Sequence, residues 1–301
     1  MIRSIDGNTD LYLDTLRQIN ARMSKAQSEV SGGKRVEAPS DDPAAIANLM
    51  QVRTDLARMT QIGTNLDRVR SEVDSAEGAM QSAVKMFDEV RTLGLSASNS
   101  EQTAVSRASV AEQVGTLLQR MAALANTQVA GRFIFSGDSD QGAAYSIDLQ
   151  QNPPWTSYQG TASSRQVAHP NGGMIAVARD AQTIFENPDP AKNVFQAMED
   201  LRQALISNDT DAIQAALAPL PGISDHINSM LSFYGNVQSR LEDAVNTSSK
   251  EQVRLKADRG RLEDADPAQA ILDLTQLKYS QQAALEVRSK VGKTSLFDYM
   301  G

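Results

Sequence analysis

Several features that would point to common functions are missing from this chain of 301 residues. It has no cysteine, which excludes thiol catalysis, disulfides and cysteine-based metal sites. No run of about 20 apolar residues occurs, so we expect no membrane span, and the first twelve residues lack the apolar core of a Sec-type signal peptide. Its 29 basic and 37 acidic residues give a net charge of −8, which argues against nucleic-acid or anionic-membrane partners.

The most regular pattern runs from Pro43 to about Ala97. Apolar residues recur there every seventh position, with a second row three or four residues away, which is typical of a long helix packed along other helices. About 55 residues at about 1.5 Å each predict a helix of roughly 80 Å. Such a helix needs partners along its length. The first row is Val52, Met59, Leu66, Val73, Met80 and Phe87.

Other stretches have the same helical period. A thin amphipathic stripe covers residues 9–30 and stops at Gly32-Gly33, a return helix should run to about Val129, and shorter helices should follow Pro190. We expect Pro219 and Pro221 to stop these short helices. A second long seam spans residues 223–262, and a last thin helix covers 267–291.

The middle of the chain is different. Between Phe133 and Phe185 lie six of the 14 aromatic residues, separated by Gly, Pro and Asn-Gly turn signals, which predicts short strands. The candidate strands are 132–136, 145–149, 164–169 and 174–178. The fold class is therefore mainly α with a small β insert: N- and C-terminal segments form long antiparallel coiled-coil-like rods around an antiparallel β domain.

The expected domains follow from this near-palindromic order. Residues 1–40 and 265–301 form terminal helices, residues 41–130 and 190–264 form the helical rods, and residues 131–189 form the inserted β-rich domain. Each terminal helix has too little apolar area to fold alone.

Three helix starts share the sequence Asp-Pro-Ala. Asp42, Asp189 and Asp266 are predicted N-caps, each followed by a proline at the first helical position. Gln269 stands where it would complete a capping box with Asp266. The acidic cluster Glu263, Asp264 and Asp266 could instead bind a metal, although a capped helix start explains it better.

Neither histidine indicates catalysis. His169 precedes a proline in a turn, and His226 lies in a helix without a second histidine nearby. The pairs Gly32-Gly33 and Gly172-Gly173 lack the following Lys-Ser/Thr of a phosphate loop. We therefore expect no cofactor and no metal.

Two further patterns have open alternatives. The charges of Lys34, Arg35, Asp41 and Asp42 either pair between subunits or form a solvated turn. The terminal apolar stripes either close on each other within one chain or are assembly surfaces that neighbouring subunits complete. The candidate assembly residues are Leu16, Ile19, Met23, Val30, Leu274, Leu277, Ala284, Val287 and Val291. The candidate connector residues are Arg35, Asp41, Asp42, Pro43, Asp264 and Asp266.

Three motifs resemble the flagellin family. They are Ser31-Gly-Gly-Lys-Arg-Val with Pro39-Ser-Asp-Asp-Pro43, Gly235-Asn-Val-Gln-Ser-Arg-Leu-Glu242, and Arg261-Leu-Glu-Asp-Ala-Asp266. The resemblance covers about residues 1–130 and 220–301. Pro267 departs from the aromatic residue that is common there. The prolines of the first connector, the Phe133-Ile-Phe-Ser-Gly137 entry to the insert and the Ser295-Leu-Phe-Asp-Tyr299 ending are similar to the hook–filament junction branch of the family.

The resemblance implies a secreted structural subunit of the bacterial flagellum and no enzyme. Its partners would be other copies of itself, flagellin, hook-associated protein 1 and an export chaperone of the flagellar type III apparatus. It also implies that the terminal segments are mobile in the free subunit and become ordered in the polymer. A short filament flagellin is the alternative. A signalling coiled coil, which would need a hairpin tip at the chain centre, and an enzyme built on the insert are remote alternatives.

Overall fold

The computed structural model describes residues 3–291, with side chains described for residues 10–287 and 289. The helices are α1 (Arg3–Gly32), α2 (Pro43–Ala97), α3 (Ala104–Ala125), α4 (Ala181–Phe185), α5 (Val194–Ser207), α6 (Thr210–Leu217), α7 (Leu220–Glu263) and α8 (Pro267–Val291). The strands are β1 (Gln128–Val129), β2 (Arg132–Phe133), β3 (Gln166–Ala168) and β4 (Met174–Ala176). The chain forms two compact units, residues 1–58 with 251–301 (unit 1) and residues 59–250 (unit 2).

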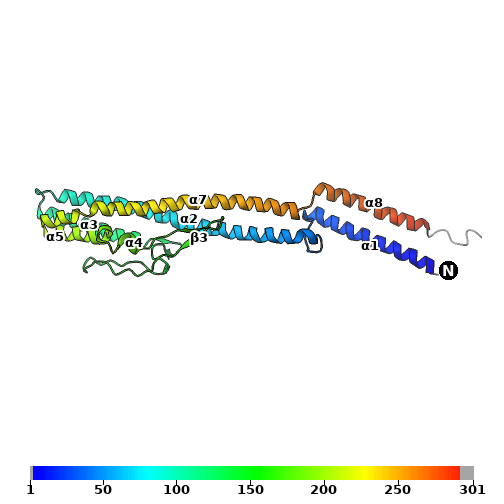
Figure 1. Ribbon diagram of the computed structural model, residues 1–301, viewed down its shortest axis with the longest axis horizontal. Helices are drawn as coiled ribbons and strands as arrows, with labels where there is room; N and C mark the ends of the chain where they lie inside the picture. The colour runs from blue at the N-terminus through cyan, green and yellow to red at the C-terminus, as the bar shows by residue number, and fades with distance from the viewer. Residues whose placement is uncertain (1–2, 292–301) are drawn as a thin grey trace, which may run out of the picture. The chain divides into compact units, whose positions relative to one another are not determined.

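In unit 2, α2 and α7 lie side by side and antiparallel (Figure 1). The Gln238 amide donates to Asp74 at 2.9 Å, and farther along Ser248 donates to the Met59 carbonyl at 3.4 Å. The predicted seam of α2 faces this partner and the shorter helices, with Leu66, Met80 and Phe87 fully buried. The long antiparallel helices that the heptad pattern predicts are confirmed.

Several element boundaries differ from the prediction. The return helix, α3, ends at Ala125 rather than near Val129, because Asn126 turns away and exchanges two hydrogen bonds with the backbone of Tyr145. The short helix α6 ends at Leu217, two residues before Pro219, as predicted, but α7 starts at Leu220, earlier than the predicted residue 223, with Pro219 and Pro221 flanking its first residue. A proline is tolerated in a first helical turn because its missing N–H has no partner there.

The insert contains less strand than the sequence predicts. Its two antiparallel ladders, β1–β2 and β3–β4, have only two or three residues per strand, and the predicted strand 145–149 is reduced to a single bridge between Ile147 and Trp155. Side chains satisfy much of the remaining backbone. For example, the single proton of the Tyr158 hydroxyl lies between two acceptors, the Phe135 carbonyl at 3.1 Å and the Thr161 carbonyl at 3.0 Å.

Aromatic packing joins this insert to the helices. The rings of Phe185 and Phe195 are stacked with centroids 5.7 Å apart, and Phe135 meets Phe185 and Tyr234 edge-on at 6.2 and 6.1 Å. All four of these rings are buried. Edge and offset arrangements of this kind suit the ring quadrupoles. The aromatic residues that predicted strands therefore serve mainly as one packed cluster.

A buried charge also ties the insert to α2. Glu72, which is 8% exposed, accepts from Arg132 Nη2 at 3.2 Å and from Arg165. Arg132 also pairs with Asp140 at 3.2 Å. Because an unpaired buried carboxylate would be strongly unfavourable, these arginines neutralise Glu72 and hold the insert at this place on the helix.

Two of the three predicted N-caps open α-helices. Asp42 Oδ1 accepts from Ala45 N at 3.0 Å, and Asp266 Oδ1 accepts from Ala268 N at 2.8 Å. Asp189 caps only a 3₁₀ turn, Pro190–Lys192, after which Asn193 caps α5. Asp266 Oδ1 also accepts from Gln269 N at 3.3 Å, which is one half of the predicted capping box. The Gln269 side-chain amide donates to Asp273 at 2.8 Å instead of returning to Asp266.

Candidate assembly surface

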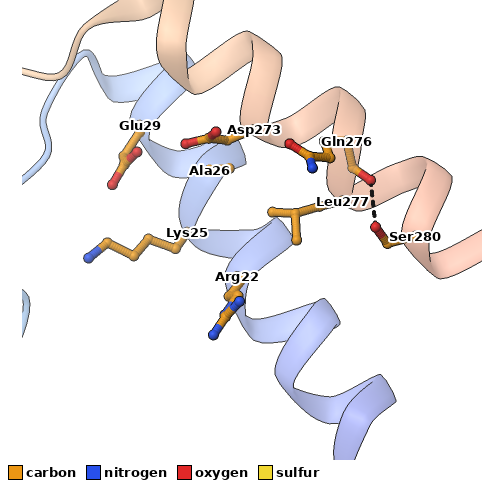
Figure 2. A pocket seen from close by; sticks show the side chains of 8 residues that line it. All are labelled: Arg22, Lys25, Ala26, Glu29, Asp273, Gln276, Leu277 and Ser280. Carbon is orange, nitrogen blue, oxygen red and sulfur yellow. Dashed lines mark hydrogen bonds between the residues drawn. The ribbon is translucent and has the colours of Figure 1, made fainter.

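The terminal helices form an antiparallel pair in unit 1. α1 and α8 run side by side (Figure 1), and the Gln281 amide donates to the Asn20 side chain at 2.7 Å. Figure 2 shows Leu277 of α8 directed toward α1 beside Ala26. Ala26 and Ala270 are buried, but the larger apolar side chains between the helices are only half-buried. The pair therefore has a thin seam and no thick core of its own.

Most of the predicted assembly residues lie on this seam. Half-buried are Leu16, Ile19, Met23, Leu274, Leu277 and Ala284. Val30 and Val287 are exposed, at 39% and 60%, and the Val291 side chain lies outside the described residues. The stripes thus contact each other within one chain.

A second set of apolar side chains points to solvent. On α8, Leu272 and Tyr279 are 64% and 70% exposed and lie seven residues apart, on the side away from the seam. Besides Val30 and Val287, the other exposed large apolar side chains of the pair are Leu11, Leu13, Ile271 and Leu285. The predicted stripes do not include this set, because each stripe follows only one face of its helix. The sequence does indicate exposed apolar side chains there, because apolar residues occur on several faces of α8.

Exposed apolar surface is concentrated in unit 1. Among the described side chains, fourteen large apolar residues are exposed, and ten of them belong to unit 1. Unit 2, which is longer, contributes the other four, namely Leu95, Val105, Met174 and Ile206, while its buried side chains form the large hydrophobic cluster. The exposed large apolar side chains are therefore distributed unevenly between the two units.

The seam opens on one side into a shallow groove. Figure 2 shows Arg22, Lys25 and Glu29 of α1 along one wall and Asp273, Gln276 and Ser280 of α8 along the other. The groove has a volume of ≈ 470 Å³ and contains both charge signs. Its walls lack a nucleophile–base pair, so the groove suits a polar protein contact better than a reaction.

The two connectors next to this pair are joined to each other. Residues 33–36 and 263–265, which we call the clasp, exchange backbone hydrogen bonds: Ala265 N donates to Gly33 O at 3.0 Å, and Arg35 N donates to Glu263 O at 2.8 Å. Lys34 and Asp264 form an antiparallel bridge. The Arg35 guanidinium adds a bond to the Leu262 carbonyl at 3.0 Å.

The Glu263 side chain lies at the centre of the clasp and is 5% exposed. Its Oε1 is 2.7 Å from Lys34 Nζ and 3.2 Å from Arg53 Nη2, and its Oε2 is 3.7 Å from Arg259 Nε. The hydrogen bond from Lys34 lowers the pKa of Glu263, and Arg53 adds to the effect. Cations thus occupy the place that a metal would need, and the capped-start interpretation explains Asp266.

The connector charges have partners within the chain. Arg35 pairs with Asp42 at 2.7 Å, Lys34 pairs with Glu263, and Asp41 accepts from the backbone N–H groups of Glu37 and Ala38 at 3.0 and 2.7 Å. The side chains of Lys34 and Arg35 remain 49% and 43% exposed, so these pairs within the chain leave both alternatives, pairing between subunits and a solvated turn, as predictions. Sequence spacing could not reveal the pair of Lys34 with Glu263, because the two residues are far apart along the chain.

The remaining candidate sites have structural roles. His226 Nε2 lies 3.2 Å from the carbonyls of Thr183 and Ile184, and His169 Nδ1 accepts from Asn171 N at 3.1 Å. Within the part of the chain that the structure describes, no cluster of acidic and histidine side chains could hold a metal ion. In the same part, every helix is too short or too polar to cross a bilayer.

These features define a helical structural subunit with a self-complementary terminal pair. Models of known families identify it further: the bacterial flagellin N-terminal helical region matches residues 9–140, and the bacterial flagellin C-terminal helical region matches residues 222–300. The chain therefore belongs to the bacterial flagellin family. It is a structural component of the flagellum and not an enzyme, and the signalling alternative has no support.

Relatives of two kinds resemble this chain. The flagellin of Listeria monocytogenes serovar 1/2a is 21% identical over 280 residues, which cover 93% of this chain and 91% of that flagellin. The solved structure of flagellar hook associated protein-3 from Legionella pneumophila covers 71% of this chain and 98% of its own, with a TM-score of 0.62 and 14% identity. The Xanthomonas campestris FlgL structure covers 67% and 97%, with a TM-score of 0.59 and 16% identity. The likeness to the two solved structures shows the shared fold.

Proposed function

We propose that this protein is the subunit that joins hook to filament, the role of hook-associated protein 3, and that it assembles through its terminal helices. The observation that supports assembly is the concentration of exposed apolar side chains in unit 1, ten of fourteen among the described ones. A pair that already contacts itself along one seam still leaves Leu272 and Tyr279 for a neighbour to cover.

The junction role is supported by sequence and by likeness. The motifs at Pro39–Pro43 and Phe133–Gly137 resemble the junction branch, and the solved neighbours bear hook-associated names. The partners would be other copies, flagellin and hook-associated protein 1, and the subunit would be exported unfolded with a chaperone by the type III apparatus. The absence of cysteine fits such export. The division into terminal, rod and insert domains at residues 40, 130, 190 and 264 belongs to the same proposal.

A short filament flagellin is the second candidate, because two of the curated relatives are flagellins of which the match covers 91%. Deleting the gene separates the two. A cell that builds hooks but releases flagellin into the medium has lost a junction subunit. Loss of the main protein from purified filaments would instead identify a flagellin and refute the junction role.

A paired substitution tests the assembly surface. We expect Leu272→Gln with Tyr279→Gln to abolish incorporation into hook–filament particles, because the polar chains remove the apolar contact of the outer face of α8. Both positions are exposed, so the fold should change by no more than about 0.5 kcal/mol. The matched control is Val105→Gln with Ile206→Gln, two exposed residues of unit 2. Equal incorporation of both variants, measured by mass spectrometry of purified particles, would refute the proposed surface.

A further inference from the structure

The terminal pair has little that would specify its own register. Its seam residues repeat at steps of three and four, so a shift of about one turn still brings apolar side chains together. The residues buried within it, Ala26 and Ala270, are small. Thin repetitive seams of this type leave register open unless a polar contact selects one alignment.

The clasp supplies such a contact at the point where the two helices meet their connectors. Its carboxylate, Glu263, is surrounded by cations from three places: Lys34 in the first connector, Arg53 in α2 and Arg259 in α7. Asp264, the next acidic residue along the chain, is at an exposed position of the second connector. The backbone bonds between Gly33 and Ala265 then fix where α1 ends relative to where α8 starts.

A contact farther along the pair shows the alignment that the clasp accompanies. Asn20, thirteen residues before Gly33, meets Gln281, sixteen residues after Ala265. Counted outward from the clasp, the two helices therefore have an offset of three residues at this contact. A shift of about one turn would bring Asn20 to a position three or four residues away on α8.

We propose that Glu263 is a positioning residue that sets the register of α1 against α8, and thereby the arrangement of side chains on the assembly face. The carboxylate contributes nothing to the seam directly. It holds two connectors, which are 227 or more residues apart along the chain, in one alignment. Only the consequence for assembly rests on the proposed function; the register itself is a property of the single subunit.

The absence of cysteine makes the register directly measurable by engineered disulfides. One chain contains Asn20→Cys with Gln281→Cys, the pair whose side chains touch, and the other contains Asn20→Cys with Ala284→Cys, which reports a shift of about one turn. We expect the first pair to cross-link and the second to do so poorly. With Glu263→Ala or the isosteric Glu263→Gln, the ratio of the two yields should fall by about tenfold or more.

The matched control is Glu251→Ala, which removes an ion pair to Arg254 on the same helix, outside the clasp. It should leave the ratio unchanged. If both Glu263 variants keep the wild-type ratio, the proposal is wrong. If both cross-links vanish while Trp155 fluorescence shows unit 2 folded, Glu263 holds the pair together without setting register, which also overturns it.

Assembly gives an independent readout. Glu263→Gln should reduce incorporation into hook–filament particles, and the engineered disulfide between positions 20 and 281 should restore it by locking the alignment. Failure of the disulfide to rescue would overturn the role of register in assembly. Failure of the unaltered chain to join any particle would refute the proposed function, yet it would leave the cross-linking result intact.

Discussion

Replacing Glu72 by glutamine tests whether one buried carboxylate holds the insert on α2. The substitution keeps the size of the side chain and removes its charge, so two guanidinium groups, Arg132 and Arg165, then face each other. Arg132 retains Asp140 at 3.2 Å, but Arg165 loses its carboxylate. The charge of Arg165, which then has no carboxylate to balance it beside Arg132, should weaken the contact between the insert and α2.

The exposure of the partners sets the expected magnitude. Removing one member of a fully buried ion pair destabilises a protein by about 3–5 kcal/mol. Here the side chains of Arg132 and Arg165 are 35% and 21% exposed and can be partly hydrated after the change, so we expect about 2–3 kcal/mol. With a urea dependence of about 2–3 kcal/mol per molar, the unfolding midpoint should fall by about 1 M.

The single tryptophan reports on this region. The Trp155 indole donates to Glu186 at 3.1 Å, and its ring lies 5.6 Å from Phe195, so its fluorescence should follow the loss of insert packing. Urea titrations would record this signal and far-ultraviolet circular dichroism together. Glu89→Gln, at an exposed position on the same helix, is the control and should stay within about 0.5 kcal/mol. A Glu72→Gln midpoint within about 0.2 M of the unaltered chain would refute the reasoning.

Three other changes have expected outcomes. Gly94→Ala should destabilise the fold by about 1–3 kcal/mol, because the new methyl carbon would lie 2.7 Å from a Leu217 carbon. Gly78→Ala, where the added methyl meets open space, should stabilise it by about 0.5–1 kcal/mol. The midpoints of urea unfolding should therefore shift in opposite directions for the two variants. Phe185→Ala should cost about 3–5 kcal/mol in thermal unfolding, and a loss under about 1 kcal/mol would contradict the packing described. Burial lowers the pKa of His226, so the stability that its neutral form contributes is complete above its ordinary pKa of about 6.5 and is lost as the pH falls below that value. His226→Gln should flatten the pH dependence of the free energy of unfolding below about pH 6.5, and an unchanged slope would count against this expectation.

The helical part of the fold was predictable because its signal is periodic. The boundaries predicted for the long helix, Pro43 and Ala97, are those of α2, and the second seam and last helix lie where α7 and α8 do. A heptad pattern repeats the same information many times, so single exceptions do not obscure it. Caps at Asp42 and Asp266 added sharp starts.

The insert was predictable only in part. Turn signals and aromatic residues correctly placed β2, β3 and β4, but residues 128–129, which form β1, were predicted as the end of the return helix. Strand length was also overstated, because Tyr158, Asn126 and Asp138 bond to backbone groups that strands would otherwise pair. Side-chain-to-backbone bonds of this kind compete with regular structure and have no period. A local pattern therefore cannot distinguish them from a strand edge.

For this protein, the sequence by itself determined the long helices, their order and the apolar stripes of the two ends, since each depends on residues close together along the chain. Only the tertiary structure decided the partners of charges such as Glu72 and Glu263, and which apolar side chains the terminal pair leaves exposed. Those contacts join residues 60 to more than 200 positions apart. Their existence depends on which surfaces meet after folding, and no local spacing encodes that choice.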